Sequence, residues 1–218
     1  MIPLELVFTG TGRCATQAYA RYAYASGLQC DHEAIFGPYG YKDAKNNRRR
    51  HPTLTGESSW MAAPYLNQPM LKEAFVVHLV RHPKSVIESW LRTPEKFWHY
   101  AHWQFAAKHM GIVLTSENLL TWLTERYVRW NQMIENGMVG HSYIRIRVET
   151  NPKQAFRELA CCGLPIQVNP SDPIWKGRNI NAHWQNAQPK TQFELQNVES
   201  ERLREQLRSM ASRYGYAL

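Results

Sequence analysis

Apolar runs alternate with helical patterns along this chain, and their order predicts an α/β fold. The two clearest runs are Leu4–Phe8 and Ala74–Val80, both typical of strands in a parallel sheet that is covered on both faces. The alternation in Tyr143–Val148 indicates another strand, and Leu28–Ile35 is a candidate for a shorter one. Because helical patterns separate these segments, the sequence predicts a mainly parallel sheet.

The expected helices follow the strands closely. They cover Ala15–Ser26, Lys84–Leu91, two segments between Glu95 and Glu135, Pro152–Cys162 and Gln192–Tyr214. The stretches Gly37–Thr55 and Ser171–Gln188 are rich in polar and turn-forming residues and are expected to be loops. Gly56–Leu66 fits either a strand or a short helix. With no repeat or linker evident, residues 1–218 are expected to form a single domain.

The first strand leads into a glycine-containing turn, Thr9–Gly12, and then into a helix that begins near Ala15. Such a turn leaves backbone N–H groups unpaired at the positive end of the helix dipole, which suits an anion and usually a phosphate. Arg13 adds a cation with several donors for phosphate or sulfate oxygens. We therefore expect this loop to hold the 5′ end of a nucleotide.

The same loop also fits a second class of nucleotide site. The spacing of Gly10, Gly12 and Ala15 matches the dinucleotide fingerprint of Rossmann domains, and Asp31 or Glu33 lies near the distance expected for a ribose-binding acid. The Gly-Lys-[Ser/Thr] ending of a Walker A loop is missing, so hydrolysis of ATP or GTP is not indicated. The loop alone leaves the two classes open.

A second segment favours a nucleotide with two separate phosphates. Arg81 stands at the carboxyl end of the strand Ala74–Val80, and Ser89 follows within the next helix. Ligands of parallel sheets bind beyond the carboxyl ends of the strands. An arginine and a helical serine placed there can hold a second phosphate.

Together the two segments resemble the sulfotransferases that use 3′-phosphoadenosine 5′-phosphosulfate (PAPS). The resemblance implies a P-loop-like three-layer α/β sandwich, with the 3′-phosphate held by Arg81 and Ser89. It assigns the 5′-phosphosulfate to the loop residues Gly12, Arg13, Cys14, Ala15, Thr16 and Gln17. The run from Tyr143 to Leu164 is similar to the family's strand-Glu-loop-helix-Gly-Leu segment. A late loop, Lys176, Gly177 and Arg178, resembles the one that closes on the nucleotide.

The resemblance also implies a reaction, the transfer of SO₃ from PAPS to an acceptor hydroxyl. Arg13 would stabilise the phosphosulfate, and Glu33 would be the base, with His32 as the alternative because its pKa is naturally near neutrality. Cytosolic members carry a catalytic histidine where this chain has Gly56–Ser59, and a glycine is usual where it has Ala15. No metal is implied.

The composition of the chain indicates which classes of partner and which compartment to expect. The net charge of +8 favours polyanions, and we expect a nucleotide rather than nucleic acid, with a basic nucleic-acid-binding module as one alternative and a Rossmann NAD(P)-dependent oxidoreductase as the other. No apolar run approaches the roughly 20 residues of a membrane span, and no signal peptide is evident, so a cytoplasmic protein is expected. The four cysteines lack zinc-site spacing.

The acceptor is not named by any motif. A small molecule, a glycan or a lipid all remain open, as does the oligomeric state. The aromatic tract Phe97–Phe105 has helical spacing, which is typical of core, but its histidines and tryptophans also suit a wall of an acceptor site.

Overall fold

The computed structural model describes residues 4–38, 40–41, 55–93, 100–113, 115, 119–168 and 192–218. Within these ranges the strands are β1 (Leu6–Gly10), β2 (Cys30–His32), β3 (Phe36–Gly37), β4 (Gly40–Tyr41), β5 (Gly56–Ser58), β6 (Phe75–Val80) and β7 (Tyr143–Arg147). The helices described there are α1 (Thr16–Ala25), α3 (Pro83–Leu91), α4 (Ala101–Met110), α5 (Leu119–Gly137), α6 (Pro152–Cys161) and α7 (Glu201–Arg213), with 3₁₀ turns η1 (Trp60–Tyr65), η2 (Pro69–Leu71) and η6 (Leu195–Asn197).

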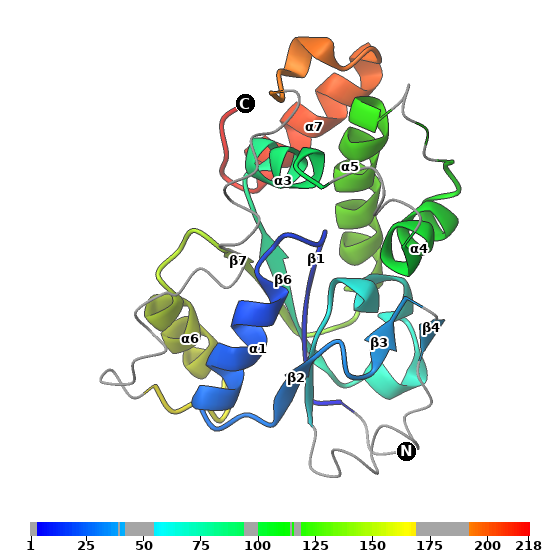
Figure 1. The fold of residues 1–218 in the computed structure, drawn as a ribbon. Coiled ribbons are helices and arrows are strands. Elements are labelled where there is room, and N and C mark those ends of the chain that lie inside the picture. Colours follow the sequence, from blue (N-terminus) through cyan, green and yellow to red (C-terminus); the bar gives the residue numbers. More distant parts are fainter. Residues whose placement is uncertain are drawn as a thin grey trace.

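Five strands form one parallel sheet in the order β2-β5-β1-β6-β7, which confirms the predicted α/β fold (Figure 1). β1 lies at the centre, where Val7 is paired with Glu57 of β5 on one side and Val76 of β6 on the other. Numbered in chain order, these strands run 2-3-1-4-5 across the sheet. That order differs from the 3-2-1-4-5-6 order of Rossmann folds, in which the second strand lies beside the first.

Helices cover both faces of the sheet (Figure 1). On one face α1 and α6 pack against β1, where the Phe8 ring lies 5.7 Å from Tyr19 and 6.1 Å from Phe156, centroid to centroid. On the other face the buried His78 of β6 contacts α5 through a 2.8 Å hydrogen bond between its Nε2 and Asn131 Oδ1. Apolar runs such as Leu6–Phe8 are therefore buried on both sides, as a covered parallel sheet requires.

Three elements differ from their predicted extents. The segment Gln192–Tyr214 is not one helix, because the Ser200 side chain accepts from Leu203 N–H and caps a helix that begins only at Glu201. The second strand ends at His32, because Glu33 has a left-handed backbone with φ 54°. The expected loop after Gly37 contains the short antiparallel hairpin of β3 and β4.

The ambiguous segment Gly56–Leu66 contains both alternatives in turn. β5 completes the sheet beside β1, and η1 begins directly after Ser59, whose side chain accepts from Met61 N–H at 3.1 Å. η1 packs beneath α5, and Trp130 Nε1 donates to the Trp60 carbonyl at 3.1 Å. Within the described ranges, no helix is both long enough and apolar enough to cross a membrane.

Candidate active site

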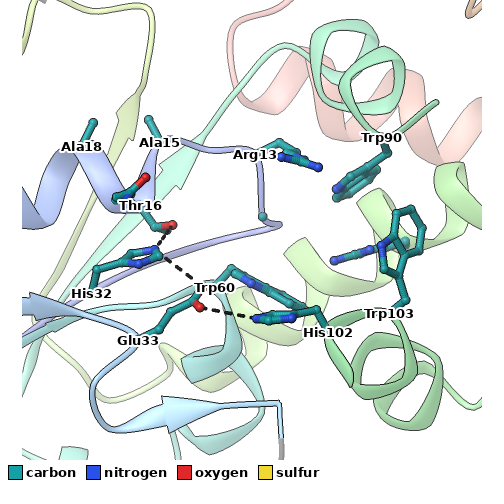
Figure 2. Close-up of a pocket in the computed structure, with 13 residues that line it drawn as sticks. Arg13, Ala15, Thr16, Ala18, His32, Glu33, Trp60, Trp90, His102 and Trp103 are labelled. Carbon is teal, nitrogen blue, oxygen red and sulfur yellow. Dashed lines mark hydrogen bonds and ion pairs between the residues drawn. The ribbon is translucent and has the colours of Figure 1, made fainter. Parts of the chain in front are cut away.

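A cavity of about 400 Å³ opens at the carboxyl edge of the sheet. Its walls come from the loop after β1, the first turn of α1, the end of β2, η1, and the helices α3, α4 and α5 (Figure 2). The volume falls within the range of about 300–1,000 Å³ that is usual for small-molecule sites. This is also the edge at which parallel sheets bind their ligands.

The loop between β1 and α1 lines this cavity with Gly12, Arg13 and Ala15. Gly10 permits the tight turn, because a Cβ there would lie 2.5 Å from the Leu79 carbonyl oxygen. Gly12, Arg13 and Ala15 all have positive φ, at 77°, 57° and 58°. Left-handed residues in a turn occur in the loops with which proteins bind anions through backbone N–H groups.

Helix α1 begins without a side-chain cap at Ala15 and without an acidic residue in its first turn. The residues of this first turn line the cavity, so its N–H donors and the positive end of the dipole face the cavity. An uncapped and unneutralised helix start of this kind favours a bound anion.

Arg13 is held by the segment just after α3, where its Nη2 donates to Thr93 Oγ1 at 3.1 Å. Burial lowers the pKa of Arg13, and the neighbouring Arg81 lowers it further. Arg81 lies behind the loop and donates from Nη1 to the Arg13 carbonyl at 3.1 Å. The two strand ends singled out in the sequence therefore meet, although among the described residues Arg81 and the half-buried Ser89 are not part of the cavity wall.

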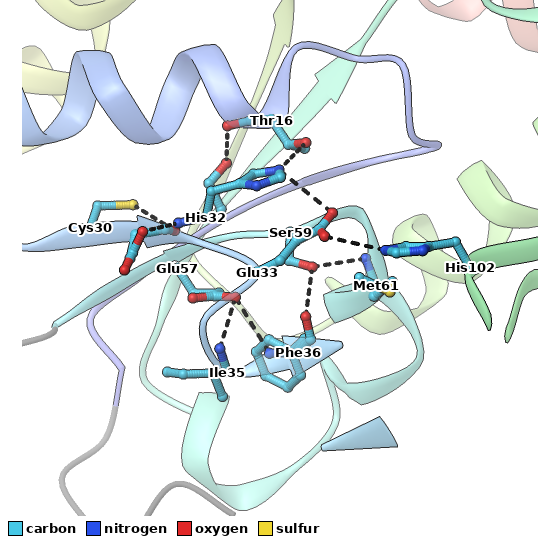
Figure 3. A network of polar contacts seen from close by, with 12 residues as sticks. Thr16, Cys30, His32, Glu33, Ile35, Phe36, Glu57, Ser59, Met61 and His102 are labelled. Atoms are coloured by element: carbon cyan, nitrogen blue, oxygen red, sulfur yellow. Dashed lines mark hydrogen bonds and ion pairs between the residues drawn. The ribbon is translucent and has the colours of Figure 1, made fainter. Parts of the chain in front are cut away.

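A carboxylate lies between two histidines on the opposite wall (Figures 2 and 3). Glu33 Oε1 is 3.5 Å from His32 Nε2, and Glu33 Oε2 is 3.6 Å from His102 Nε2 of α4. His32 Nε2 also lies 3.2 Å from Thr16 Oγ1, at the start of α1. Burial lowers the pKa of His32, so its ring is neutral near pH 7 and able to share or accept a proton.

Glu57 stands in the segment where the sulfotransferase resemblance placed a catalytic histidine, but it faces away from this cavity. Its Oε1 accepts from Ile35 N–H at 3.2 Å and Phe36 N–H at 3.4 Å, so it fixes the turn that follows β2 (Figure 3). Burial raises the pKa of Glu57 to about 8. Through these contacts Glu57 supports the chain segment that follows Glu33, and its role is structural.

Arg126 is a site residue that the sequence analysis missed. It lines the cavity from α5 although only 4% of the residue is exposed. Its guanidinium carbon lies 4.8, 4.5, 5.1 and 5.7 Å from the ring centroids of Trp60, Trp90, Trp103 and Trp122. Burial, and then Arg13, lower its pKa to about 9.

The structure brings most of the predicted residues to one place. Seven of the eight loop and base candidates implied by the sulfotransferase resemblance line the cavity directly: Gly12, Arg13, Ala15, Thr16, Gln17, His32 and Glu33. Cys14 is buried below the loop, 3.2 Å from Thr11 Oγ1, and burial raises the pKa of its thiol. Lys176, Gly177 and Arg178 lie outside the described residues.

The aromatic tract contributes to the core, as predicted, and part of it also lines the cavity. Trp103 and Phe105 are buried, while Trp103 and His102 also line the cavity. The tract's first residues, Phe97–His99, lie outside the described ranges. No protein-family model matches this chain, and no curated protein matches it either.

Proposed function

We propose that this protein transfers a sulfuryl group from PAPS to an acceptor hydroxyl. The observation that carries the proposal is that a cationic loop with an uncapped helix start faces, across one cavity, a carboxylate flanked by two histidines. The loop suits the phosphosulfate end of the donor. The carboxylate suits removal of a proton from the acceptor.

In the proposed reaction, the acceptor oxygen attacks sulfur in line with the oxygen that bridges sulfur and the 5′-phosphate. A new bond forms between the acceptor oxygen and sulfur, and the bond from sulfur to the bridging oxygen breaks. The electron pair of that bond remains on the 5′-phosphate, and the acceptor proton passes to Glu33 and then to water. The products are a sulfate monoester and adenosine 3′,5′-bisphosphate.

The protein's contribution to this reaction is positioning and electrostatic stabilisation, as in phosphoryl transfer. Negative charge gathers on the 5′-phosphate as the bond breaks, and the N–H groups of the loop and the fixed Arg13 guanidinium are placed to stabilise it. Arg81 and Ser89 are proposed to bind the 3′-phosphate at the end of β6. The hydrogen bond from Arg81 to the Arg13 carbonyl links the two phosphate sites.

The arrangement of strands weighs against the NAD(P) alternative. In a Rossmann site the acid at the end of the second strand lies next to the glycine turn because those strands are neighbours. Here β2 pairs with β5, and β5 separates it from β1. The nucleic-acid alternative has only the net charge in its favour, since a concave cavity of this size suits a small ligand.

The test is thermal unfolding with adenosine 3′,5′-bisphosphate, NAD and a DNA oligomer in separate titrations. A ligand at 100 times its Kd adds about 2.7 kcal/mol to the free energy of unfolding, which is roughly 5–10 °C for a protein of this size. We expect such a shift with the bisphosphate alone. Arg13→Ala should lose the shift, and Arg129→Ala, an exposed site on α5, should keep it. Stabilisation by NAD or DNA only would remove the proposal.

A further inference from the structure

The cavity has a second cation that the proposed donor does not explain. Arg126 is almost fully buried, and its Nε has no hydrogen-bond partner. Within the part of the chain that the structure describes, no carboxylate forms an ion pair with it. Buried charges in proteins are nearly always paired, because an unpaired one loses its hydration without compensation.

The tryptophans around Arg126 do not complete its hydrogen bonding. Ring faces attract a guanidinium group, but none of them supplies an oxygen atom for its N–H donors. Trp60, Trp90 and Trp103 also line the cavity, so the same rings that surround the cation form flat apolar walls. The combination of flat walls and a planar set of donors fits a ring that carries a carboxylate.

Arg126 adjoins the loop of the donor site, since a Cβ on Gly12 would lie 3.6 Å from its Nη2, but two of its tryptophans lie away from the first turn of α1. Trp90 and Trp103 lie on the side of the cavity opposite Thr16 and His32, and Glu33 and His102 lie along the edge between the two sides (Figure 2). The first turn of α1 takes the donor's phosphosulfate in the proposed function. Arg81, proposed for the 3′-phosphate, lies behind the loop rather than among the tryptophans. The tryptophan side is therefore available to the acceptor.

We infer that the acceptor is a hydroxyaryl carboxylate, with its carboxylate on Arg126, its ring between the cavity tryptophans and its hydroxyl toward Glu33. This inference rests on the proposed function for the reaction, but the anion site on Arg126 stands on its own contacts. The phenolic proton passes to Glu33 as the phenolic oxygen bonds to sulfur, and the bridging S–O bond breaks toward the 5′-phosphate. The product is an aryl sulfate that retains its carboxylate.

The experiment is a titration of intrinsic tryptophan fluorescence with 4-hydroxybenzoate and with its methyl ester, in the absence of donor. Four of the chain's eight tryptophans surround Arg126, so binding there changes the signal directly. We expect 4-hydroxybenzoate to bind at least 10-fold more tightly than the uncharged ester, since a charged hydrogen bond contributes about 1.5–3 kcal/mol.

Arg126→Met should remove this preference and unfold at the same or a higher temperature than the wild type, because an unpaired buried charge is replaced by an apolar side chain. Arg129→Met, on the same helix, serves as the matched control and should retain the preference. If Arg126→Met does not fold, the comparison of acid and ester on the wild-type protein still decides the inference, and Arg126→Lys tests the planar donor set. Lysine should weaken carboxylate binding but keep part of the preference.

Calorimetric titration of the same variants with adenosine 3′,5′-bisphosphate separates this inference from the proposed function. If the bisphosphate binds but acid and ester bind equally, the inference is overturned and the proposed function stands. If the acid is preferred but the bisphosphate does not bind, the anion site stands and sulfuryl transfer does not. Loss of bisphosphate binding in Arg126→Met, with the preference for the acid unchanged, would assign Arg126 to the donor and overturn the inference.

Discussion

Glu33 is held in a backbone conformation that few non-glycine residues adopt. Its φ of 54° places it in the left-handed region, where strain costs about 1–3 kcal/mol. Pairing with the neighbouring strand maintains this conformation, because Glu33 N–H donates to the Ser58 carbonyl at 3.3 Å. The result is that the carboxylate turns out of the sheet and toward His32 and His102 instead of continuing β2.

Glu33→Gln should therefore reduce turnover while leaving the binding of adenosine 3′,5′-bisphosphate within about twofold of wild type. Glutamine has nearly the same shape, but its amide does not accept the acceptor's proton, and general base catalysis contributes about 10²–10⁴-fold. Turnover is measured with labelled PAPS and a hydroxylated acceptor, and affinity by calorimetry. Glu125→Gln, whose side chain pairs with Arg129 on α5, is the control. Wild-type turnover in Glu33→Gln would disprove the assignment of the base.

Some residues of the site could be predicted from the sequence and others could not. Arg13 was predictable because a glycine turn after a buried strand is a local pattern. Arg126 was not recognised, although it lies four residues from both Trp122 and Trp130 and so shares their helix face. An arginine on an apolar face is a signal of a buried cation, but which cavity it faces depends on tertiary packing. Ala15 adopts the left-handed conformation with φ 58°, although it is not a glycine.

At the scale of elements, β5 positions the part of the cavity wall that contains Glu33. It lies between β1 and β2, and Glu57 at its centre accepts hydrogen bonds from the N–H groups of Ile35 and Phe36. The second carboxylate oxygen of Glu57, Oε2, is buried and has no hydrogen-bond partner among the described residues. A carboxyl in these surroundings favours the protonated form.

This burial predicts a pH dependence of stability. The pKa of Glu57 is about 8 in the folded protein against 4.5 as its ordinary value, so between these values the folded state holds a proton that the unfolded chain releases. Its contribution to the free energy of unfolding is therefore fully present below pH 4.5 and is lost as the pH rises toward 8. Glu57→Gln keeps an oxygen acceptor for Ile35 and Phe36 and has no charge to bury.

Relative to wild type, Glu57→Gln should gain roughly 4 kcal/mol of unfolding free energy between pH 5 and pH 8.5. The measurement is urea unfolding at both pH values, with the exposed Glu73→Gln as the control. If the difference in unfolding free energy between Glu57→Gln and wild type is the same at both pH values, the Glu57 carboxyl does not hold the extra proton of the folded state.

The ends of helices and strands were predictable where a local sequence pattern determines them. They were not predictable where tertiary packing determines them. The strand Phe75–Val80 was evident because it is apolar except for His78, and the start of α3 was evident from Pro83. The helix expected from Gln192 begins only at Glu201, because the Ser200 cap decides its start. Periodicity in the residues before the cap reflects buried side chains such as Phe193 and Val198 in an irregular segment.

At the scale of the whole molecule, the site depends on strand order, which no local pattern specifies. A parallel α/β sheet followed from the alternation of strands and helices. The insertion of β5 between β1 and β2 did not, and it is this insertion that sets Glu33 across a cavity from Arg13 rather than beside the glycine turn. Likewise α4 and α5 close the far side of the cavity by long-range packing, which brings His102 and Arg126 to residues near the start of the chain.

In the proposed site, the ends of β1 and β6 hold two different phosphates of one nucleotide. Because Arg81 also donates to the Arg13 carbonyl, its loss removes a contact with the loop as well as the proposed contact with the 3′-phosphate. Affinity for a single ligand does not separate these two effects. Comparing two ligands separates them, because adenosine 3′,5′-bisphosphate and adenosine 5′-monophosphate differ only in the 3′-phosphate.

The deciding measurement is the calorimetric affinity of both nucleotides for wild type and Arg81→Ala. We predict that wild type binds the bisphosphate at least 10-fold more tightly than the monophosphate, and that this advantage disappears in Arg81→Ala while monophosphate binding remains. An advantage that persists in Arg81→Ala, or equal weakening of both nucleotides, would show that Arg81 does not bind the 3′-phosphate.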